Sequence, residues 1–509
     1  MAVPLHAGTL SSLSIPVPSY DRSKLTPGIV HIGVGGIQQS PRYIQRLPPR
    51  APGEVRGCRA VHGWRRRLAM GHLGRRTDAL RRQDEGCHVL GPHCEFLFAP
   101  EEHDAVVARL AAATTKVVTL TVTEKGYCSN LSTGALDTSL PAVQADLAKI
   151  AAGEIALQSS LGFLAAAAKK RMSDGAPPLA ILSCDNVQEN GHKLERCMLE
   201  FAALAGGPEL RSYIESKWTF PNSMVDRITP ATNDGHREAI EKEFGIKDQW
   251  PVVCEDKFPA GRPPWEQVLG GSCLMVEDVL PYELMKLRLL NGSHQAVGYC
   301  GVLAGHRAVD QAMNDPAIQK YITSYMDAVG QSVPAVPGVD LTSYKVNLRS
   351  RFSNEALKDQ LLRLTEDARN RIQVACLPCL EGMPPETCGP VAAVIACWVR
   401  YLAESTDEKG VGFGISADAF RTELEPTAVK MWGSAKGGGA SAEQAAVFLR
   451  SAFANPTERL LALAPEVARL LTVTASITGI AGSPGCAGGG FQVIEVAGPS
   501  FAHGPHGPP

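Results

Sequence analysis

The stretch GIVHIGVGG, residues 28–36, decides the fold of the first half of the chain. Its β-branched run ends in glycines, which is typical of a buried strand that enters a tight turn. Gly33, Gly35 and Gly36 would let a pyrophosphate approach the backbone closely, and a helix that starts after them would direct its positive end at that charge. The motif is incomplete, because Gln38 stands at the third glycine position of G-x-G-x-x-G. From the glycines alone, a dinucleotide site and an ordinary strand-turn both remain open.

Apolar strands and helical segments alternate through the rest of the first half. Buried strands are predicted at 116–127 (KVVTLTVTEKGY) and at 179–186 (LAILSCDN), and helical periodicity follows at 191–205. Such alternation is typical of a parallel α/β sheet. Residues 1–280 are therefore predicted to form a Rossmann-like dinucleotide-binding domain.

The second half changes to long helical stretches separated by loops rich in Pro and Gly. These stretches lie at 282–305, 355–372 and 389–405. Residues 281–483 are predicted to form a mostly α-helical substrate and catalytic domain, and the tail 484–509, rich in Gly, Pro and His, is predicted to be disordered. The predicted fold class is thus an α/β N-terminal domain followed by a mostly α-helical C-terminal domain.

The composition of the 509 residues is that of an ordinary globular protein, with 44% hydrophobic and 20% charged residues. No apolar run approaches the roughly 18 residues that a membrane-spanning helix needs, and no secretory signal stands at the start. A cytoplasmic protein without membrane contact is therefore predicted. The formal net charge of −2 argues against nucleic acid as a partner of the whole chain.

The 14 cysteines are scattered without a repeating spacing, which is typical of reduced, mostly buried thiols. The single CxxC pair, Cys376 and Cys379, is interpreted as buried packing and not as a metal or redox site. No metal is predicted.

A second constellation lies in the predicted helix around KLRLLNGSHQ, residues 286–295. At about 100° per residue, Lys286, Asn291 and His294 fall within an arc of roughly 140°, and Glu283 falls inside the same arc. Removal of a hydride from a secondary alcohol needs a base for the hydroxyl proton and donors for the oxyanion, which a lysine and asparagine amides supply without a metal. The alternative is a solvated lysine, an asparagine that caps a turn and a core histidine with satisfied hydrogen bonds. The residues alone leave both interpretations open.

Six longer motifs extend this pattern along the chain. They are KVVTLTVTEKGYC (116–128), SCDNVQENGH (183–192), FPNSMVDRITPATND (220–234), EDKFPAGRPPWE (255–266), YELMKLRLLNGSHQA (282–296) and VPGVDLTSYKVNLRSRFSN (336–354). Their order and spacing resemble those of the polyol-specific long-chain dehydrogenases, with the mannitol 2-dehydrogenase branch the most similar. The resemblance covers roughly residues 28–36 and 97–425. It implies a Rossmann-type N-terminal domain, a helical C-terminal domain, a site in the cleft between them and no zinc.

The resemblance also implies a catalytic role for several residues. Lys286 would be the general base, and Asn186 of SCDN together with Asn291 would hold the substrate oxygen that becomes an oxyanion. His294 would orient the substrate hydroxyl, and Glu283 would lie on the proton path between Lys286 and solvent.

Further residues are implied to bind the substrate chain and the cofactor. Asp226, Arg363 and Arg371 would bind the polyol chain or shape its pocket. Relatives usually carry Lys at the position of Arg371, and the fork geometry of a guanidinium differs from that of an ammonium. Glu124 of TEKGY and the glycine turn would face the cofactor, which is expected to be NAD, with NADP left open.

The implied reaction is the reversible oxidation of an acyclic polyol at C2, D-mannitol to D-fructose, by a monomer that acts on small molecules. One alternative is a hexuronate reductase acting on fructuronate or tagaturonate, because TEKGYC and QENGH also resemble that branch. An alternative of another class is an inactive relative that binds nucleotide or nucleic acid through residues 41–90.

Residues 37–96 and 254–258 depart from the family pattern. Arginines crowd 41–90, where relatives carry a second strand with an acidic residue near the ribose. Two interpretations are kept for this segment: a stretch translated in a shifted frame, and a genuine insert whose arginines bind a 2′-phosphate. In the second region, relatives carry a stretch like PFxQWVxE that is missing here. Both departures leave open whether this chain is active.

Overall fold

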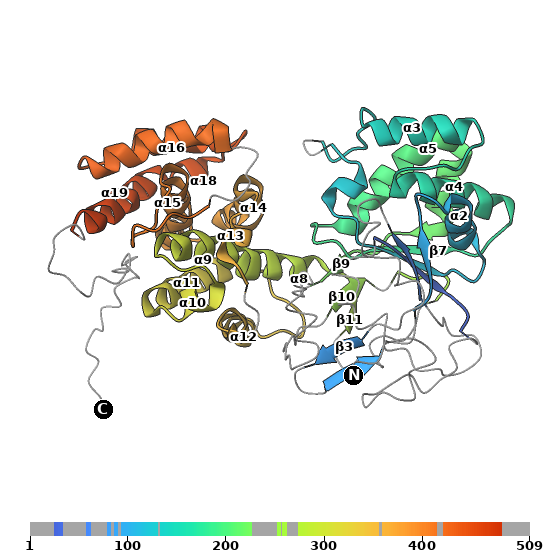
Figure 1. Ribbon diagram of the computed structural model, residues 1–509, viewed down its shortest axis with the longest axis horizontal. Coiled ribbons are helices and arrows are strands. Elements are labelled where there is room, and N and C mark those ends of the chain that lie inside the picture. Colours follow the sequence, from blue (N-terminus) through green and yellow to red (C-terminus); the bar gives the residue numbers. More distant parts are fainter. Residues whose placement is uncertain are drawn as a thin grey trace, which may run out of the picture. The chain divides into compact units, whose positions relative to one another are not determined.

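The computed structural model describes residues 25–33, 58–62, 79–82, 86–89, 93–130, 133–225, 252–255, 257–261, 273–355, 359–414 and 421–480. The chain divides into two compact units, Met1–Leu280 and Pro281–Pro509. Figure 1 shows the first unit, which contains the strands, in blue to green, and the second, helical unit in yellow-green to red. The predicted class, an α/β domain followed by a mostly helical one, is confirmed. The predicted disordered tail 484–509 lies outside the described residues.

The described strands all belong to the first unit. They are β1 Ile29–Ile32, β2 Cys58–His62, β3 Ala79–Arg82, β4 Gly86–Val89, β5 His93–Phe98, β6 Val117–Leu120, β7 Leu179–Ser183, β8 Trp218–Thr219, β9 Ser223–Met224, β10 Val252–Glu255 and β11 Cys273–Val276. Six of them form one sheet in the order β5-β2-β1-β6-β7-β8, and every neighbouring pair in it is parallel. By chain position within the sheet this order is 3-2-1-4-5-6, the order of a doubly wound dinucleotide-binding fold.

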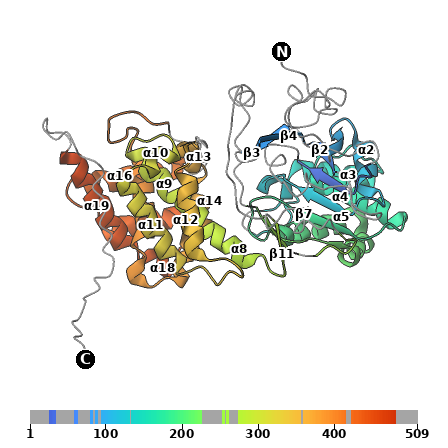
Figure 2. The same cartoon turned by 90° about the horizontal axis from the view of Figure 1, so that it is seen from below.

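The centre of this sheet is its most buried part. All four residues of β1 and all four of β6 are buried, and their registers pair Ile29 with Val117 and Ile32 with Leu120. Strands buried on both faces are expected where crossover helices cover a parallel sheet. The covering helices, gathered around the sheet in Figures 1 and 2, are α2 His103–Ala111, α3 Pro141–Ala151, α4 Ser160–Ser173 and α5 Asn190–Lys217.

A buried arginine joins two of these helices. Arg171, near the end of α4, donates hydrogen bonds to the carbonyl oxygens of Leu110 (3.2 Å) and Ala112 (3.0 Å) at the end of α2, and to that of Pro177 (2.5 Å). The last carbonyl groups of a helix lack partners within it and carry partial negative charge. The guanidinium therefore satisfies these carbonyls, although burial lowers the pKa of Arg171.

The strand predicted at 116–127 is only partly confirmed. β6 ends at Leu120, and the chain then turns into a short 3-10 helix, η5 Glu124–Tyr127. Thr123 has a positive φ of 63°, and a Cβ on Gly126 would lie 2.5 Å from the Cβ of Val122, so this backbone cannot continue as a strand. The other predicted strand ends at Ser183, and the predicted helix is confirmed as α5.

The described parts of the irregular segment 37–96 are strands. β2 and the start of β5 lie at one edge of the parallel sheet, and β3 and β4 form a separate two-stranded antiparallel sheet. Neither interpretation of the arginine-rich sequence is tested by these strands. The shortened region 254–258 begins within β10, which pairs with β9 and β11 in a three-stranded sheet.

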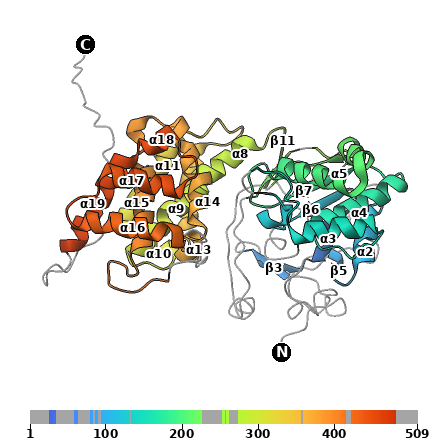
Figure 3. The ribbon, with the colours of Figure 1, turned by 90° about the horizontal axis from the view of Figure 1, so that it is seen from above.

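The helical unit is built around a buried, apolar helix. Its described helices are α8 Leu280–Met285, η6 Lys286–Asn291, α9 Gly292–Leu303, α10 Val309–Met313, α11 Pro316–Gly330, α12 Leu341–Phe352, α13 Leu361–Leu364, α14 Ala368–Ala375, η8 Leu377–Gly382, η9 Pro385–Thr387, α15 Gly389–Ala403, α16 Arg421–Lys436, α17 Ala442–Ala452, α18 Glu458–Leu461 and α19 Ala464–Ile480. α15 is buried on all sides from Pro390 to Leu402 and contacts α9, α11, α16 and α19 (Figure 3). A helix that is apolar all round is expected at such a core.

The helices predicted at 282–305 and 389–405 are confirmed, whereas the single helix predicted at 355–372 is wrong. That stretch contains two short helices, α13 and α14, separated at Asp367, whose φ of 51° is left-handed. Apolar periodicity continues across the break, so the pattern alone could not reveal it.

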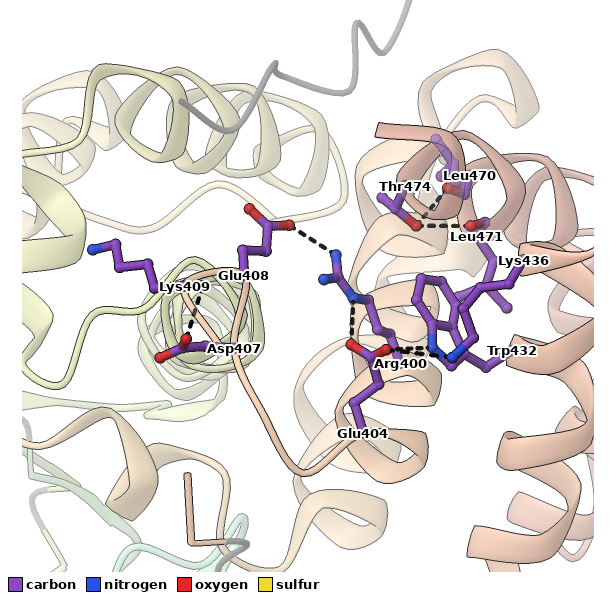
Figure 4. A network of polar contacts seen from close by, with 10 residues as sticks. All are labelled: Arg400, Glu404, Asp407, Glu408, Lys409, Trp432, Lys436, Leu470, Leu471 and Thr474. Atoms are coloured by element: carbon purple, nitrogen blue, oxygen red, sulfur yellow. Dashed lines mark hydrogen bonds and ion pairs between the residues drawn. The ribbon is translucent and has the colours of Figure 1, made fainter. Parts of the chain in front are cut away.

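A polar network fixes α15 to its neighbours (Figure 4). Arg400 is 2% exposed; its Nε lies 3.3 Å from Glu404 Oε2 and its Nη1 donates to Glu408 Oε1 at 2.9 Å. The guanidinium carbon lies 5.0 Å from the ring centroid of Trp432, whose indole N–H donates to Glu404 at 2.7 Å. The backbone N–H of Glu408 donates to the carbonyl of Leu303 at the end of α9. The buried guanidinium of Arg400 is thus paired with two carboxylates and one aromatic ring, which offsets the cost of burying its charge.

None of the helices in the described part of the chain is long and apolar enough to cross a membrane.

Candidate functional site

Gly33 directly follows β1 at the carboxyl edge of the parallel sheet. Its φ of 93° is left-handed, and a Cβ at this position would overlap the carbonyl oxygen of Thr121, which follows β6. Only glycine fits such a conformation at such a close approach. Gly35 and Gly36, the other predicted cofactor residues of the turn, lie outside the described residues.

The strand order makes this edge a binding position. β1 and β6 are the neighbours at which the order reverses, with β2 on one side and β7 on the other. In open α/β sheets a crevice for a ligand forms at the carboxyl ends of the two strands where the order reverses. The described part of the glycine turn therefore fits a bound dinucleotide.

The turn after β6 carries Glu124 at this same edge. Thr123 has φ 63° and ψ 169°, a conformation that a β-branched residue rarely adopts, and Glu124 follows it as an exposed residue. The backbone N–H groups of Val122 and Thr123 donate to the two carboxylate oxygens of Asp185 at 3.1 and 2.8 Å. The position of Glu124 is therefore set by a carboxylate that the sequence pattern did not single out.

Asn186 lies in the loop that follows β7, and this loop is tied down at both ends. Asn186 itself is exposed, whereas Asp185 before it is buried. The fully buried Asn190 donates from Nδ2 to the carbonyl oxygens of Asp185 (3.0 Å) and Ser223 (2.9 Å), and its Oδ1 accepts from the N–H of Ser223 at 3.0 Å. Asn222 accepts from the N–H of Gly191 at 2.9 Å, near the start of α5. Asn190 and Asn222 stand in the motifs NGH and FPNS, but only their partners identify them as residues that hold the loop.

Burial shapes the ionisation of this loop. It raises the pKa of Asp185, while the two N–H groups from Val122 and Thr123 act in the opposite direction. Burial also raises the pKa of Tyr127, whose hydroxyl is hydrogen-bonded to Ser183. The phenol therefore stays neutral and acts as a hydrogen-bonding group.

Glu283, Lys286, Asn291 and His294 lie on one continuous run of helix, α8, η6 and α9. Glu283 and Lys286 are each 5% exposed, so the alternative interpretation of a solvated lysine does not hold. The helical geometry also differs from the prediction, because Lys286–Asn291 is a π-helix and not an α-helix. Backbone hydrogen bonds in a π-helix join residues i and i+5, so side chains five positions apart become neighbours on one face. Lys286 and Asn291 are five apart, and the π-turn aligns them more closely than the predicted arc.

The end of the π-turn is fixed by packing. A Cβ on Gly292 would overlap the hydroxyl of Tyr325 in α11, and the next nearest atom, the ring Cζ, would lie at 3.2 Å. Tyr325 is fully buried and donates a hydrogen bond to the thiol of Cys376 at 3.4 Å. Gly292 is thus required at this position for close approach, a role that the motif LLNGSH did not reveal.

His294 is anchored by an aromatic partner. Its ring stacks on Phe352 of α12, with the centroids 4.9 Å apart and the planes at 29°. Stacking on this ring fixes the orientation of the imidazole.

The two predicted substrate-binding arginines have other partners in the helical unit. Arg363 is exposed and forms a two-pronged ion pair with Asp359, at 2.8 and 2.5 Å. Arg371 donates from Nη1 to the carbonyl oxygens of Arg363 (3.0 Å) and Leu364 (3.2 Å) at the end of α13. Asp226 lies outside the described residues.

The CxxC pair is part of the core. Burial raises the pKa of Cys376 to about 12 and that of Cys379 to about 11, so both thiols are protonated at neutral pH. Across the described ranges, no cluster of three or more His, Cys, Asp or Glu residues is arranged to hold a metal ion.

Two family models match the chain: the mannitol dehydrogenase Rossmann domain over residues 92–267 and the mannitol dehydrogenase C-terminal domain over residues 278–437. The chain belongs to the mannitol dehydrogenase family. The Rossmann match begins at 92, after the arginine-rich segment in which the resemblance is lost.

Curated relatives and solved structures agree with this membership. A mannitol 2-dehydrogenase of Aspergillus terreus is 37% identical over 441 residues, with 81% of this chain and 86% of that protein covered. One of Pyrenophora tritici-repentis is 36% identical over 453 residues, with 84% and 78% covered. The structure of Pseudomonas fluorescens mannitol 2-dehydrogenase in ternary complex with NAD and D-mannitol matches at a TM-score of 0.74 and 31% identity, with 93% and 98% of the chains covered. A substrate-free D-sorbitol dehydrogenase matches at a TM-score of 0.72 and 29% identity, with 83% and 90% covered.

At the level of the family, the prediction of an NAD-dependent polyol dehydrogenase is confirmed. The role of each residue, the monomeric state and the cytoplasmic location stay predictions.

Proposed function

We propose that this chain catalyses the reversible, NAD-dependent oxidation of D-mannitol at C2 to D-fructose, with Lys286 as the general base. The substrate follows from the mannitol 2-dehydrogenases among its relatives, which share more than a third of their aligned residues with it. One observation supports the catalytic assignment. Lys286 is 5% exposed and begins a π-turn that ends at Asn291, and residues five apart in such a turn, here an amine and a carboxamide, are expected on one face of the helix.

The residues of the helical unit divide the proton chemistry among them. Neutral Lys286 takes the proton from the C2 hydroxyl at Nζ, and Asn291 donates from its amide to the oxygen on which negative charge grows. His294, held by Phe352, orients the hydroxyl. The buried Glu283, one helical turn before Lys286, accepts the proton from the resulting ammonium group on its carboxylate and releases it to solvent.

The first unit is proposed to hold the cofactor. Gly33 would hold the dinucleotide together with Gly35, Gly36 and Glu124, because the left-handed glycine at the end of β1 leaves no side chain in its way. NAD, when bound, accepts the hydride that leaves C2. Asn186, which is exposed on the loop after β7, donates a second amide hydrogen bond to the substrate oxygen.

The substrate chain is assigned to Asp226, Arg363 and Arg371. Arg371 uses one nitrogen for the carbonyl groups at the end of α13, and a guanidinium has five N–H donors in all, so donors remain for polyol hydroxyls. Arg363 is paired with Asp359 and is proposed to shape the pocket.

The proposal is tested by assaying the purified protein with NAD and D-mannitol, with D-sorbitol as the matched polyol, and with NADH and fructuronate for the hexuronate alternative. Turnover of D-mannitol with a kcat/KM at least about tenfold above that of D-sorbitol is expected, since each correctly paired hydroxyl contributes about that factor. Turnover of fructuronate in place of D-mannitol would contradict the proposed substrate. Salt-sensitive nucleotide binding without turnover of any of the three would support the inactive relative.

A further inference from the structure

The turn between β6 and η5 holds a conformation that its own sequence does not favour. Thr123 has φ 63° and ψ 169°, and threonine is branched at Cβ, so its side chain crowds the backbone in this region. Strained backbone of this kind persists only where the surroundings impose it, and it is concentrated at functional sites. The turn leads directly to Glu124 at the carboxyl edge of the sheet.

One side chain is hydrogen-bonded to the backbone of this turn. Asp185 follows β7, the neighbour of β6 in the sheet, and reaches across to the turn. Its Oδ2 accepts from the N–H of Val122 at 3.1 Å, and its Oδ1 accepts from the N–H of Thr123 at 2.8 Å. Both carboxylate oxygens thus accept from the residues before Glu124, and the carboxylate is also hydrogen-bonded to the hydroxyl of Tyr127.

The same residue is also fixed to the loop on its other side. The carbonyl oxygen of Asp185 accepts from Nδ2 of the buried Asn190, and Asn186 is the next residue in the chain. Asp185 therefore joins the turn of Glu124 and the loop of Asn186 into one rigid piece.

Stability alone does not account for a carboxylate here. Asp185 is 4% exposed, and burial raises its pKa, which means that the charged form is disfavoured in the folded protein. An ionised carboxylate nevertheless offers what a neutral amide lacks, namely two acceptor oxygens for two adjacent N–H groups.

We propose that Asp185 is a positioning residue for the dehydrogenase reaction, whose carboxylate holds the strained Val122–Glu124 turn at the cofactor edge and the adjoining Asn186 in their working geometry. This inference rests on the proposed function, because it assigns the cofactor and the substrate oxygen to that edge.

Asp146 supplies a matched control in the same unit. It is fully buried, and its carboxylate accepts from the N–H groups of Gln158 and Ser159, each at 2.7 Å. These partners lie before α4, and Ser159 has an ordinary φ of −100°. Asp146 thus makes the same kind of hydrogen bonds in a helix cap, with no strained turn beside it.

The test compares Asp185→Asn with Asp146→Asn in the full-length enzyme. Asparagine keeps one acceptor oxygen and loses the other, so Asp185→Asn is expected to raise the KM for NAD about tenfold and to lower kcat about tenfold, the effect of one charge-assisted hydrogen bond. Asp146→Asn is expected to lower the melting temperature while the KM for NAD and kcat stay within about twofold of wild type. Equal behaviour of the two variants, with a stability loss only, would overturn the inference.

A second variant removes the strain itself. Glycine adopts a positive φ without cost, so Thr123→Gly added to Asp185→Asn is expected to recover most of the NAD affinity, measured by quenching of protein fluorescence on titration. If Asp185→Asn alone does not fold, the double variant is expected to fold and to bind NAD. A double variant that folds but binds NAD no better than Asp185→Asn, or that does not fold, overturns the inference.

Hydrogen exchange gives a readout that does not depend on activity. The amides of Val122 and Thr123 are expected to exchange at least about tenfold faster in Asp185→Asn than in wild type, and no faster in Asp146→Asn. Unchanged exchange at both amides would overturn the inference. A wild-type enzyme that fails to oxidise D-mannitol contradicts the proposed function instead, so the two failures are distinguishable.

Discussion

At the carboxyl edge of the parallel sheet, Thr123 has a positive φ, and the N–H groups of Val122 and Thr123 each donate a hydrogen bond to Asp185. In the helical unit, the run that carries Lys286 is held in a π-turn that ends where Gly292 packs against Tyr325. Both regions leave regular backbone geometry where the proposed chemistry lies. The first departure is maintained by directed polar contacts, and the second by close packing.

This difference decides how each region responds to substitution. A hydrogen-bonded turn tolerates extra volume poorly when the neighbouring atom belongs to the backbone, because a backbone carbonyl cannot be shortened. A packed turn can be repaired by removing atoms from the side chain on the other side of the contact. Gly33 is an example of the first case, because a Cβ there would meet a backbone carbonyl, and Gly292 is an example of the second, because a Cβ there would meet a side-chain hydroxyl.

Among the changes to the backbone turns and their packing, the largest effect is expected for Gly33→Ala. The added methyl group would overlap the carbonyl oxygen of Thr121, and a φ of 93° is strained for alanine. NAD affinity is expected to fall by about 100-fold or more, since displaced backbone at a phosphate cradle loses several contacts together. Isothermal titration with NAD measures it, with Gly153→Ala, which has open space and also a positive φ, as the control for strain alone. Equal affinities of the two variants would contradict the role of Gly33.

The next effect is expected for Gly292→Ala, which should lower kcat about 100-fold because Lys286 and Asn291 shift relative to each other. Tyr325→Phe removes the hydroxyl that the new methyl would overlap and leaves the ring Cζ at 3.2 Å. The double variant is therefore expected to recover most of the kcat. Gly298→Ala, in the same helix, would place its Cβ 3.2 Å from a side-chain methyl of Thr365 and is expected to change kcat less than about threefold. A failure of Tyr325→Phe to rescue would show that packing does not hold the turn.

Much of this molecule could be predicted from the sequence. The run GIVHIGVGG predicts β1 and the tight turn that begins at Gly33, and the placement of Lys286, Asn291 and His294 on one helix follows from apolar periodicity. The π-turn could not be predicted, because the extra residue per turn leaves the apolar pattern of a buried helix unchanged.

Asp185 could not be assigned from the sequence for a different reason. Its partners are backbone groups that lie 63 and 62 residues away, at Val122 and Thr123, and backbone groups leave no residue-type signal. The polar run SCDN after a buried strand was a usable indication that side chains at this edge matter. The family resemblance pointed to Asn186, the exposed member of this run, and not to its buried neighbour Asp185.

A smaller effect is expected where a side chain is oriented by stacking. Phe352→Leu removes the ring on which His294 stacks but keeps an apolar side chain, so the KM for D-mannitol is expected to rise about three- to tenfold, the loss of an aromatic contact. Phe448→Leu is the matched control, because Phe448 contacts Trp398 and belongs to α17, which carries none of the proposed catalytic residues. Steady-state kinetics of both variants checks this, and an equal KM in the two would contradict an orienting role for Phe352.

The smallest effect on turnover is expected for Cys376→Ala, which should leave kcat within about twofold but change the response of stability to alkaline pH. Burial raises the pKa of this thiol to about 12 in the folded protein, whereas the pKa of a thiol in the unfolded chain is about 8.5. A raised folded-state pKa gives stability that is complete below about pH 8.5 and is lost as the pH rises toward about 12.

Between about pH 8 and pH 10 this thiol should therefore cost the wild type about 2 kcal/mol of unfolding free energy that Cys376→Ala does not lose. Urea unfolding of both proteins at the two pH values measures the difference. Equal losses in the two proteins would contradict the burial of this thiol in neutral form.

The central claim, that the amine of Lys286 takes the proton from the alcohol, is tested most directly by chemical rescue of Lys286→Ala. This variant is expected to lose about a thousandfold or more in turnover of D-mannitol while keeping its NAD affinity. Small primary amines added to the assay should restore turnover in proportion to the concentration of their unprotonated form, because a free amine can occupy the space of the missing side chain and accept the proton. A variant that keeps more than about a tenth of the wild-type turnover, or an inactive one that binds NAD and D-mannitol normally but is not restored by any amine, would contradict it.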